Sequence, residues 1–180
     1  MKQICKKILD KTDVIRTKKL CRKHHLNFCD GVKISKDVKI KDGTKVILSP
    51  GCWISHHCSF WGGGTIVLGK NTHIGSFSSI FASKDGGVSI GDEVNCSRNM
   101  FVIDSNHSYD DVNSLIRLQP LRSEKITIGN DVWIAANVTI VKGASIGNGC
   151  VVGACSLVNK KFGDGVVLGG VPAAIIKKRF

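Results

Sequence analysis

His107 lies between two aspartates, Asp104 and Asp110, in the segment Val-Ile-Asp-Ser-Asn-His-Ser-Tyr-Asp at residues 102–110. An imidazole with an ordinary pKa of about 6.5 accepts a proton near neutral pH, and such a general base typically accelerates a reaction roughly 10²–10⁴-fold. A neighbouring carboxylate can hold the ring in the tautomer that accepts the proton. The same residues fit equally an exposed loop without a chemical role. The choice depends on the elements that position this loop.

The cysteines are the other residues in this sequence with reactive side chains. There are eight, no Cys-x-x-Cys pair occurs, and Cys52 and Cys58 are six residues apart, which is not a zinc spacing. Cys52, Cys58 and Cys96 occupy positions that favour a small apolar side chain. We therefore expect reduced cysteines that fill a core, and no metal.

A six-residue period determines the expected fold. Neither the 3.6-residue period of a helix nor the two-residue period of a strand explains it. A period of six indicates a repeat array in which each unit buries its apolar side against its neighbours. The aliphatic residues that recur at this spacing are Ile128, Ile134, Ile140, Ile146, Val152 and Val158.

Three such units close one coil of 18 residues, because small residues after the aliphatics suit a short strand followed by a corner. Parallel strands of successive coils then pair about 4.8 Å apart. The expected stacking pairs are Ile128 with Ile146, Ile134 with Val152, and Ile140 with Val158.

Upstream the period is interrupted. It runs through Ile34, Ile40, Val46, Cys52 and Cys58, and breaks at residues 61–64 and again at 84–87. A longer interruption separates residues 102 and 128, which are 26 apart, not a multiple of six. A segment between them must loop out, and that segment carries His107.

The N-terminus is basic and carries much of the net charge of +12. Residues 1–26 hold nine lysines and arginines against two aspartates, and a thin apolar stripe predicts a helix over 2–24. Such a helix can contact an anionic membrane, or pack on the body of the protein or on a neighbouring subunit. No apolar run reaches the length of a membrane span and no signal-peptide segment is evident, so we expect a cytoplasmic protein, with peripheral contact at the inner face of the membrane as an option. Nucleic acid is not an expected partner.

The sequence resembles the hexapeptide-repeat acyltransferases, and within them the maltose, galactoside and polysaccharide O-acetyltransferases. The stretches that carry the resemblance are residues 128–140, 152–158 and 169–177. The resemblance implies an all-β, left-handed parallel β-helix, a homotrimer, and acetyl-CoA as co-substrate. We then expect a basic helix at 1–26, the β-helix at 27–168 with a loop excursion at 103–126, and a C-terminal segment at 169–180.

The resemblance also implies roles for individual residues. In this family a histidine of the protruding loop is the general base, and His107 matches it by its place 17 residues after Ile90. A sugar hydroxyl that attacks a thioester must lose its proton, and direct transfer in a ternary complex needs no acyl-enzyme. By motif, the positions that hold CoA are Ala136, Ala154, Asn159 and Lys160, and Lys177 is one of the cations expected near its phosphates. The expected acceptor-binding positions are Asp85, Ser79 and Trp133, with Phe81 on the same wall.

The sequence departs from the family pattern near its C-terminus. Residues 161–165 replace the usual acidic-then-proline run, and Ala174 stands where relatives often have arginine. Lys161, Lys178 and Arg179 are therefore further candidates for the 3′-phosphate of CoA.

The expected function is acetyl-CoA-dependent O-acetylation of a sugar or a sugar-containing acceptor. The alternatives are N-acetylation of an amino sugar or an antibiotic, and a non-catalytic trimeric β-helix that binds a partner. Some trimeric β-helix proteins are zinc carbonic anhydrases with three histidines between subunits, but residues 128–160 contain no histidine.

Overall fold

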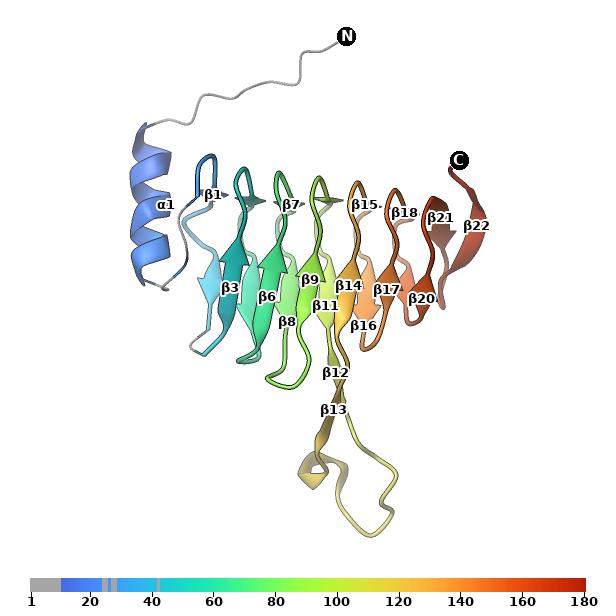
Figure 1. Cartoon of the computed structure of the whole chain (residues 1–180). Helices are drawn as coiled ribbons and strands as arrows, with labels where there is room; N and C mark the ends of the chain where they lie inside the picture. Colours follow the sequence, from blue (N-terminus) through green and yellow to red (C-terminus); the bar gives the residue numbers. More distant parts are fainter. Residues whose placement is uncertain (1–10, 24–25, 27–28, 42) are drawn as a thin grey trace.

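The computed structural model describes residues 11–23, 26, 29–41 and 43–180. One helix, α1 (Lys11–Lys23), precedes a stack of parallel coils, from which a long hairpin projects (Figure 1). The expected all-β, left-handed parallel β-helix with an N-terminal helix and a protruding loop is confirmed. Residues 1–10 of the expected helix, and His24 and His25 at its end, lie outside the described residues.

Three sheets form the walls of the prism. Sheet A contains β1 (Lys33–Ile34), β4 (Trp53–Ile54), β7 (His73–Ile74), β10 (Asn95–Cys96), β15 (Trp133–Ile134), β18 (Val151–Val152), β21 (Val166–Gly169) and β22 (Ala174–Lys178). Sheet B contains β2 (Lys39–Ile40), β5 (Ser59–Trp61), β8 (Ser79–Phe81), β11 (Phe101–Ile103), β16 (Thr139–Val141) and β19 (Leu157–Val158). Sheet C contains β3 (Lys45–Leu48), β6 (Thr65–Leu68), β9 (Val88–Ile90), β14 (Ile126–Ile128), β17 (Ser145–Ile146) and β20 (Lys161–Phe162).

All three expected stacking pairs are register partners. Ile128 pairs with Ile146, Ile134 with Val152, and Ile140 with Val158. Their side chains point into the prism and are at most 3% exposed. The apolar columns therefore form the core, while the parallel ladders satisfy the backbone amides from coil to coil.

The first coils are longer than 18 residues, so the expected phase holds through the buried Val46 but is wrong at Cys52 and Cys58. β3 has four residues, and Leu48 pairs with Leu68, 20 positions further on. Cys52 lies instead at the corner between sheets C and A, and Cys58 at the corner between sheets A and B. Both are buried at the small position that precedes the next strand, as core fillers should be.

Helix α1 packs on the first coil. The backbone N–H of Ile34 donates to Oγ1 of Thr17 at 3.3 Å, and Thr17 and Cys21 are buried. The helix thus covers the open N-terminal end of the apolar columns (Figure 1), and the side chains of Lys19 and Arg22 on it are exposed. Within the described residues, no helix combines the length and the apolar character that crossing a bilayer requires.

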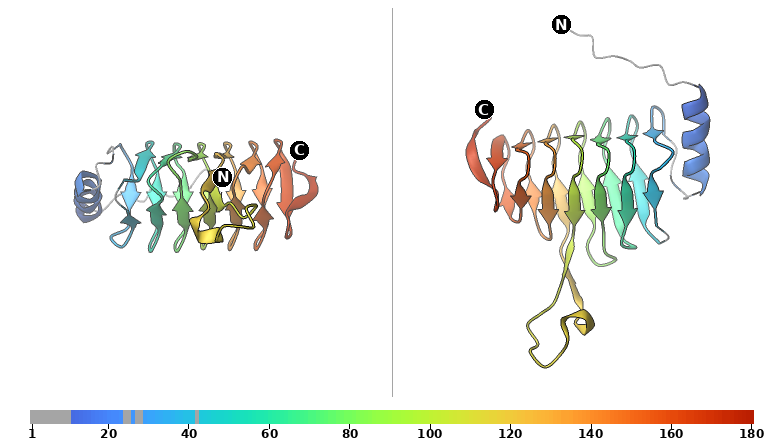
Figure 2. Two further views of the ribbon diagram at one scale, coloured as in Figure 1. Left: turned by 90° about the horizontal axis from the view of Figure 1, so that it is seen from below. Right: turned by 180° about the vertical axis from the view of Figure 1, so that it is seen from behind.

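The three sequence interruptions all fall at one corner of the prism. Residues 62–64 join β5 to β6, residues 82–87 join β8 to β9, and residues 104–125 join β11 to β14, so each connects sheet B to sheet C. The last segment forms the antiparallel hairpin β12 (Ser105–His107) and β13 (Leu121–Ser123), which projects away from the coils (Figure 2). The two longest connections between strands, residues 82–87 and 104–125, therefore leave from the same corner.

We predict that Ile140→Ala lowers the free energy of unfolding by about 2–5 kcal/mol, because it leaves a cavity in a fully buried column. Thr139→Ala, one residue away on the outer face, should change it by less than about 0.5 kcal/mol. Urea unfolding followed by circular dichroism measures both variants. Equal unfolding midpoints for the two would contradict this account of the core.

We predict that Cys155, which is exposed, reacts with Ellman's reagent before the buried thiols do. Burial raises the pKa of Cys58 to about 11 and that of Cys96 to about 12, so the reactive thiolate is scarce at neutral pH. Denaturation without reductant should then expose eight titratable thiols. Fewer than eight, or stoichiometric bound zinc, would contradict the interpretation of the cysteines as core fillers.

Candidate active site

The hairpin holds His107 clear of the coils. His107 is the register partner of Leu121, and the next amide, that of Ser108, donates to the carbonyl of Pro120 at 2.9 Å. Beyond this ladder, the Gln119 amide group donates to the carbonyls of Asp111 and Ser114 and organises the tip. The His107 side chain is exposed and makes no hydrogen bond or ion pair with any described residue. It is therefore available to a ligand.

Asp104 fastens the neck of the hairpin to the preceding coil. Its carboxylate is fully buried and accepts hydrogen bonds from the amide of Ser83 (2.9 Å), the hydroxyl of Ser83 (3.1 Å) and the amide of Gly87. Its carbonyl accepts from the amide of Glu124 at 2.9 Å, which closes the neck. A Cβ at Gly86 would lie 2.3 Å from the Asp104 carboxylate, so this approach requires glycine. Asp104 thus joins the 83–87 loop to the root of the hairpin.

Neither flanking aspartate contacts His107. Asp104 is committed to the 83–87 loop, and Asp110 forms an exposed ion pair with Arg122 on the opposite strand. Of the two roles that the sequence left open, orientation of the imidazole has no supporting contact within a single chain. The structure gives them a different role, since both stabilise the hairpin that carries the histidine.

The expected acceptor residues lie on and beside sheet B. Asp85 is exposed in the loop that Asp104 holds, at the same corner as the hairpin. The hydroxyl of Ser79, on β8, accepts from the indole N–H of Trp61 at 3.0 Å and from the hydroxyl of Ser59 at 2.9 Å. The Trp61 and Phe81 rings meet edge to face, with centroids 4.7 Å apart. Ser79 therefore belongs to a half-buried polar and aromatic cluster on the outer face of sheet B.

The expected donor residues lie closer to the C-terminal end of the prism. Ala136 and Ala154 occupy the corner between sheets A and B in successive coils, where the amide of Cys155 donates to the carbonyl of Ala136 at 2.9 Å. Asn159 and Lys160 occupy the corner between sheets B and C, and the Lys160 ammonium lies 5.5 Å from the centre of the Phe162 ring. Lys177 is exposed on β22, at the edge of sheet A.

One chain does not bring these residues together. His107, Asp85, Asn159 and Lys160 lie along the corner between sheets B and C. Ala136 and Ala154 lie along the corner between sheets A and B, and Trp133 is exposed on sheet A. The width of sheet B separates the two corners, so a single site containing both groups needs two copies of the chain.

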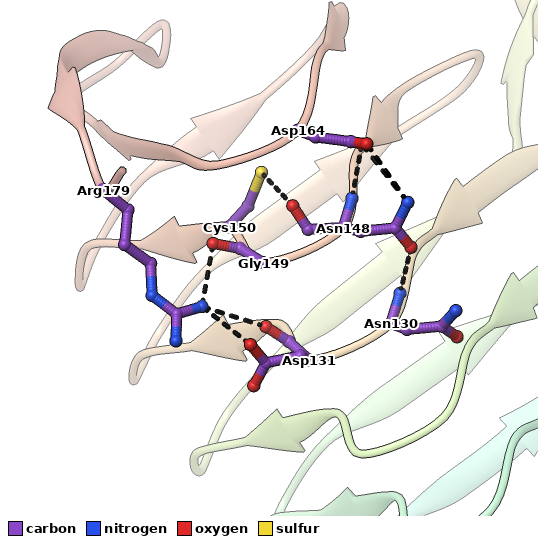
Figure 3. A network of polar contacts seen from close by, with 7 residues as sticks. All are labelled: Asn130, Asp131, Asn148, Gly149, Cys150, Asp164 and Arg179. Atoms are coloured by element: carbon purple, nitrogen blue, oxygen red, sulfur yellow. Dashed lines mark hydrogen bonds and ion pairs between the residues drawn. The ribbon is translucent and has the colours of Figure 1, made fainter.

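Arg179 is engaged elsewhere. Its guanidinium donates to the carboxylate of Asp131 and to the carbonyl of Gly149, each at 2.9 Å, at the corner between sheets C and A (Figure 3). In the same corner, Asn148 bridges Asn130 and Asp164. Arg179 thus fastens the C-terminal segment to the coils, away from both corners that carry the expected donor residues. It is not placed to meet a CoA phosphate there.

A row of side chains on the outer face of sheet A was not predicted from the sequence. Trp53, His73, Asn95 and Trp133 are successive register partners on β4, β7, β10 and β15. The rings of Trp53 and His73 stack, with centroids 4.4 Å apart and planes inclined at 25°. The only signal in the sequence is that each precedes an inward-pointing residue of the repeat. The register of uneven coils was needed to align them.

His73 is fixed within this row by two hydrogen bonds. Nε2 lies 2.8 Å from the hydroxyl of Ser55, and Nδ1 lies 3.2 Å from Oδ1 of Asn95. Because Oδ1 can only accept, Nδ1 carries the proton and Nε2 accepts from Ser55. Burial lowers the pKa of His73 below its ordinary value of 6.5, although the bond to Asn95 acts in the opposite direction. The imidazole is therefore neutral at neutral pH.

Two further described histidines, His56 and His57, are adjacent and share one carboxylate neighbour. His56 and His57 both face Asp37, with closest N–O distances of 3.2 and 3.1 Å, and His57 stacks on Phe77. Within residues 11–23, 26, 29–41 and 43–180, no three histidine, cysteine, aspartate or glutamate side chains converge in a way that could hold a metal ion.

Comparisons with known proteins agree with this geometry. The family model described as bacterial transferase hexapeptide (six repeats) matches residues 125–160. WbbJ of Escherichia coli K12, named as a lipopolysaccharide biosynthesis O-acetyl transferase, is 35% identical over 125 residues, which cover 66% of this chain and 63% of WbbJ. Galactoside O-acetyltransferase of the same organism is 33% identical over 126 residues, covering 70% of this chain and 60% of that protein. The chain therefore contains the bacterial transferase hexapeptide repeat and is similar, over about two thirds of its length, to proteins named as acetyltransferases.

Solved structures show the same fold. AntD, an N-acyltransferase from Bacillus cereus in complex with dTDP and 3-hydroxybutyryl-CoA, superimposes with a TM-score of 0.79 at 21% identity, over 91% of this chain and 88% of that one. The polySia-specific acetyltransferase NeuO gives a TM-score of 0.68 at 26% identity, over 79% of this chain and 61% of that one. Because this chain spans about three fifths of the length of the two curated relatives, at 63% and 60%, activity, acceptor and assembly are proposals for it.

We predict that Asp104→Ala destabilises the protein by at least about 1–3 kcal/mol, because it leaves the buried amides of Ser83 and Gly87 without an acceptor. Asp110→Ala, which breaks only an exposed ion pair, should cost less than about 1 kcal/mol. Thermal unfolding compares the two, and hydrogen exchange should show faster exchange at residues 83–87 in Asp104→Ala alone. Similar losses from both variants would contradict the role assigned to Asp104.

Proposed function

We propose that this protein is an acetyl-CoA-dependent O-acetyltransferase that acts on a sugar or a sugar-containing acceptor, such as a precursor of a surface polysaccharide. The observation that carries the proposal is the placement of His107. It is an exposed imidazole without a partner among the described residues, held on a rigidly anchored hairpin at the corner that also carries Asp85. This placement suits a group that takes a proton from a bound ligand.

The names of the relatives support this activity. WbbJ, galactoside O-acetyltransferase and NeuO are named as acetyltransferases of saccharides or of lipopolysaccharide biosynthesis. Structures with the same fold contain coenzyme A or acetyl-CoA. All of these relatives support acyl transfer from an acyl-CoA. O-acetylation in particular is supported by the names of WbbJ and galactoside O-acetyltransferase.

The proposed mechanism is direct transfer in a ternary complex. The acceptor hydroxyl attacks the thioester carbonyl while Nε2 or Nδ1 of His107 accepts its proton. The tetrahedral intermediate collapses with breakage of the C–S bond, and the imidazolium returns the proton to the CoA thiolate. Because the acceptor hydroxyl attacks the thioester directly, no covalent acyl-enzyme is required.

The active site is proposed to form between copies of a homotrimer. In each site, the corner between sheets B and C of one copy would supply His107 and Asp85, and the corner between sheets A and B of the next would supply Ala136 and Ala154. Because the two contacting surfaces differ, the same contact repeats from each copy to the next. In a trimer, the resulting ring closes after three copies. The exposed apolar side chains of the hairpin tip fit burial against a neighbour: Tyr109, Val112, Leu115, Ile116 and Leu118.

For the donor, backbone groups at Ala136 and Ala154 are proposed to hold the pantetheine arm. Asn159 and Lys160 are proposed to bind further along it, and Lys177 to meet the phosphates, since an ammonium attracts phosphate oxygens. Ser79 and Trp133 are proposed acceptor contacts together with Asp85. Lys161 and Lys178 remain additional candidates for the 3′-phosphate.

Two alternatives have specific support. AntD is named an N-acyltransferase, so an amino-sugar acceptor is the main alternative. Chloramphenicol acetyltransferase of Morganella morganii, 48% identical over 59 residues, makes an antibiotic acceptor a second one. A non-catalytic β-helix that binds a partner is distinguished from all of these by the absence of thiol release from acetyl-CoA with any acceptor.

Cytoplasmic location and peripheral membrane contact through residues 1–26 are also proposals. The support is the outward basic face of α1, which includes Lys19 and Arg22. Anionic lipid attracts such a face by about 1 kcal/mol per cation near the surface, and salt screens the attraction.

We predict that His107→Ala and His107→Gln lower kcat for acetyl transfer roughly 10²–10⁴-fold with little change in the Km for acetyl-CoA, because they remove the base but not the donor groove. Release of CoA thiol with a panel of sugars, amino sugars and oligosaccharides measures the rate. His56→Gln is the matched control, since His56 is exposed but faces Asp37 on the first coils.

The oligomeric mass of each variant should equal that of the wild type. Wild-type turnover by both His107 variants would refute the assignment of the base. Transfer only to amines would replace O-acetylation by N-acetylation and leave the role of the fold unchanged.

A further inference from the structure

The aromatic row on sheet A, defined as Trp53, His73, Asn95 and Trp133, lies outside the buried apolar columns. Each member precedes a buried residue of a column, so strand alternation points it away from the core. Outward positions elsewhere on the strands are divided between polar residues, such as Ser59, Thr139 and Ser145, and apolar residues, such as Trp61, Phe81 and Leu157 on sheet B. Two of the chain's three tryptophans occupy this row and are 46% and 51% exposed, whereas Trp61 packs against Phe81. Such exposed apolar surface suggests a ligand.

The row runs parallel to the axis of the β-helix, and one of its ends is Trp133, an expected acceptor-binding residue. Trp53 and Trp133 are separated by three strand steps, which is about 14 Å at 4.8 Å per step. His73 and Asn95 lie between them. A single sugar ring cannot contact both indoles, whereas a chain of linked sugars can lie along the row.

The chemistry of the row alternates in the way that a saccharide requires. A pyranose has an apolar face of C–H bonds, which stacks on an aromatic ring, and a rim of hydroxyls, which need hydrogen-bond partners. Trp53 and Trp133 supply the flat apolar surfaces. Asn95 is exposed, and its Nδ2, a double donor, makes no hydrogen bond with any described residue, because only Oδ1 is engaged by His73.

The row is also prearranged. The Trp53 indole rests on a neutral His73 ring whose two nitrogens are both hydrogen-bonded, and the Lys33 ammonium lies 6.0 Å from the centre of the indole on the side of the first coil. A platform that is already ordered loses little conformational entropy when a ligand stacks on it.

We propose that the aromatic row binds the acceptor as an extended oligosaccharide, with the acetylated sugar near Trp133 and the preceding sugars lying over Asn95, His73 and Trp53. The inference rests on the proposed function for the identity of the ligand. It adds that the acceptor is a saccharide of several units, in preference to a monosaccharide or a single-sugar nucleotide.

The binding test uses the full-length protein in its native assembly, without acetyl-CoA. Maltopentaose, chitopentaose and pentagalacturonate are titrated by calorimetry beside glucose, N-acetylglucosamine and galacturonate. At least one pentasaccharide should bind about tenfold more tightly than its monosaccharide, and Trp53→Ala should remove that advantage. Trp53→Phe, which keeps an aromatic platform, should retain most of it.

Ile47→Ala is the matched control, because Ile47 is a half-exposed apolar residue on the outer face of β3 in sheet C, at the same end of the prism. It should leave all affinities unchanged. If no pentasaccharide binds more tightly than its monosaccharide, the proposal is overturned. It is also overturned if Trp53→Ala changes only the oligomeric mass, since the row would then be a contact between copies.

Acetyl transfer separates failure of this inference from failure of the proposed function. If the pentasaccharide binds more tightly than its monosaccharide but no thiol is released from acetyl-CoA, saccharide binding by the row is supported and the acetyltransferase activity is rejected. If kcat/Km is equal for monosaccharide and pentasaccharide and Trp53→Ala does not change it, the acetyltransferase activity is supported and saccharide binding by the row is rejected. The expected result is a rise of about tenfold in the Km for the pentasaccharide in Trp53→Ala, with kcat and monosaccharide turnover unchanged.

Discussion

The parallel backbone ladder between successive coils is the constraint on which the rest of this structure depends. Each strand must bond to the one a full turn earlier, so each coil must return its chain to the same three walls whatever its length. Partners are therefore 20 residues apart near Ser59 and Ser79, 38 apart near Asp92 and Asn130, and 18 apart near Thr127 and Ser145. The buried columns make this register favourable, because a slip would expose aliphatic side chains and bury polar ones.

That constraint also decides where irregular chain can be placed. Extra residues fit into a wall only where the neighbouring coil lengthens with them, as the four-residue strands β3 and β6 do, so longer insertions leave at a corner. In this protein both long insertions, residues 82–87 and 104–125, leave at the corner between sheets B and C. The larger carries the only histidine of the hairpin, and a buried carboxylate, Asp104, anchors it to the insertion one coil earlier. The regular stack of coils thus forms the scaffold, and the inserted hairpin carries His107, the candidate catalytic residue.

The two groups of candidate residues lie on different corners of the triangular prism. Side chains on different corners face different directions and do not meet within a chain, which is why the proposed site requires a second copy. The walls between the corners remain available for extended ligands, since outward residues of the same strand position form straight rows along the axis. A linear polymer fits such a row better than a compact molecule does.

The sequence by itself determined the β-helix, its three downstream stacking pairs, the buried cysteines and the loop that carries His107. It did so because a six-residue period is local and each unit repeats the same burial. Only the tertiary structure showed that Leu48, and not Val46, joins the column with Leu68, because coil length there departs from 18. The tertiary structure alone also committed Asp104 to the 83–87 loop, Arg179 to a distant corner, and Trp53 and Trp133 to one row. These contacts join residues 17 to 48 positions apart, and the row reaches from Trp53 to Trp133 across coils of unequal length, so no local pattern encodes which residues are neighbours.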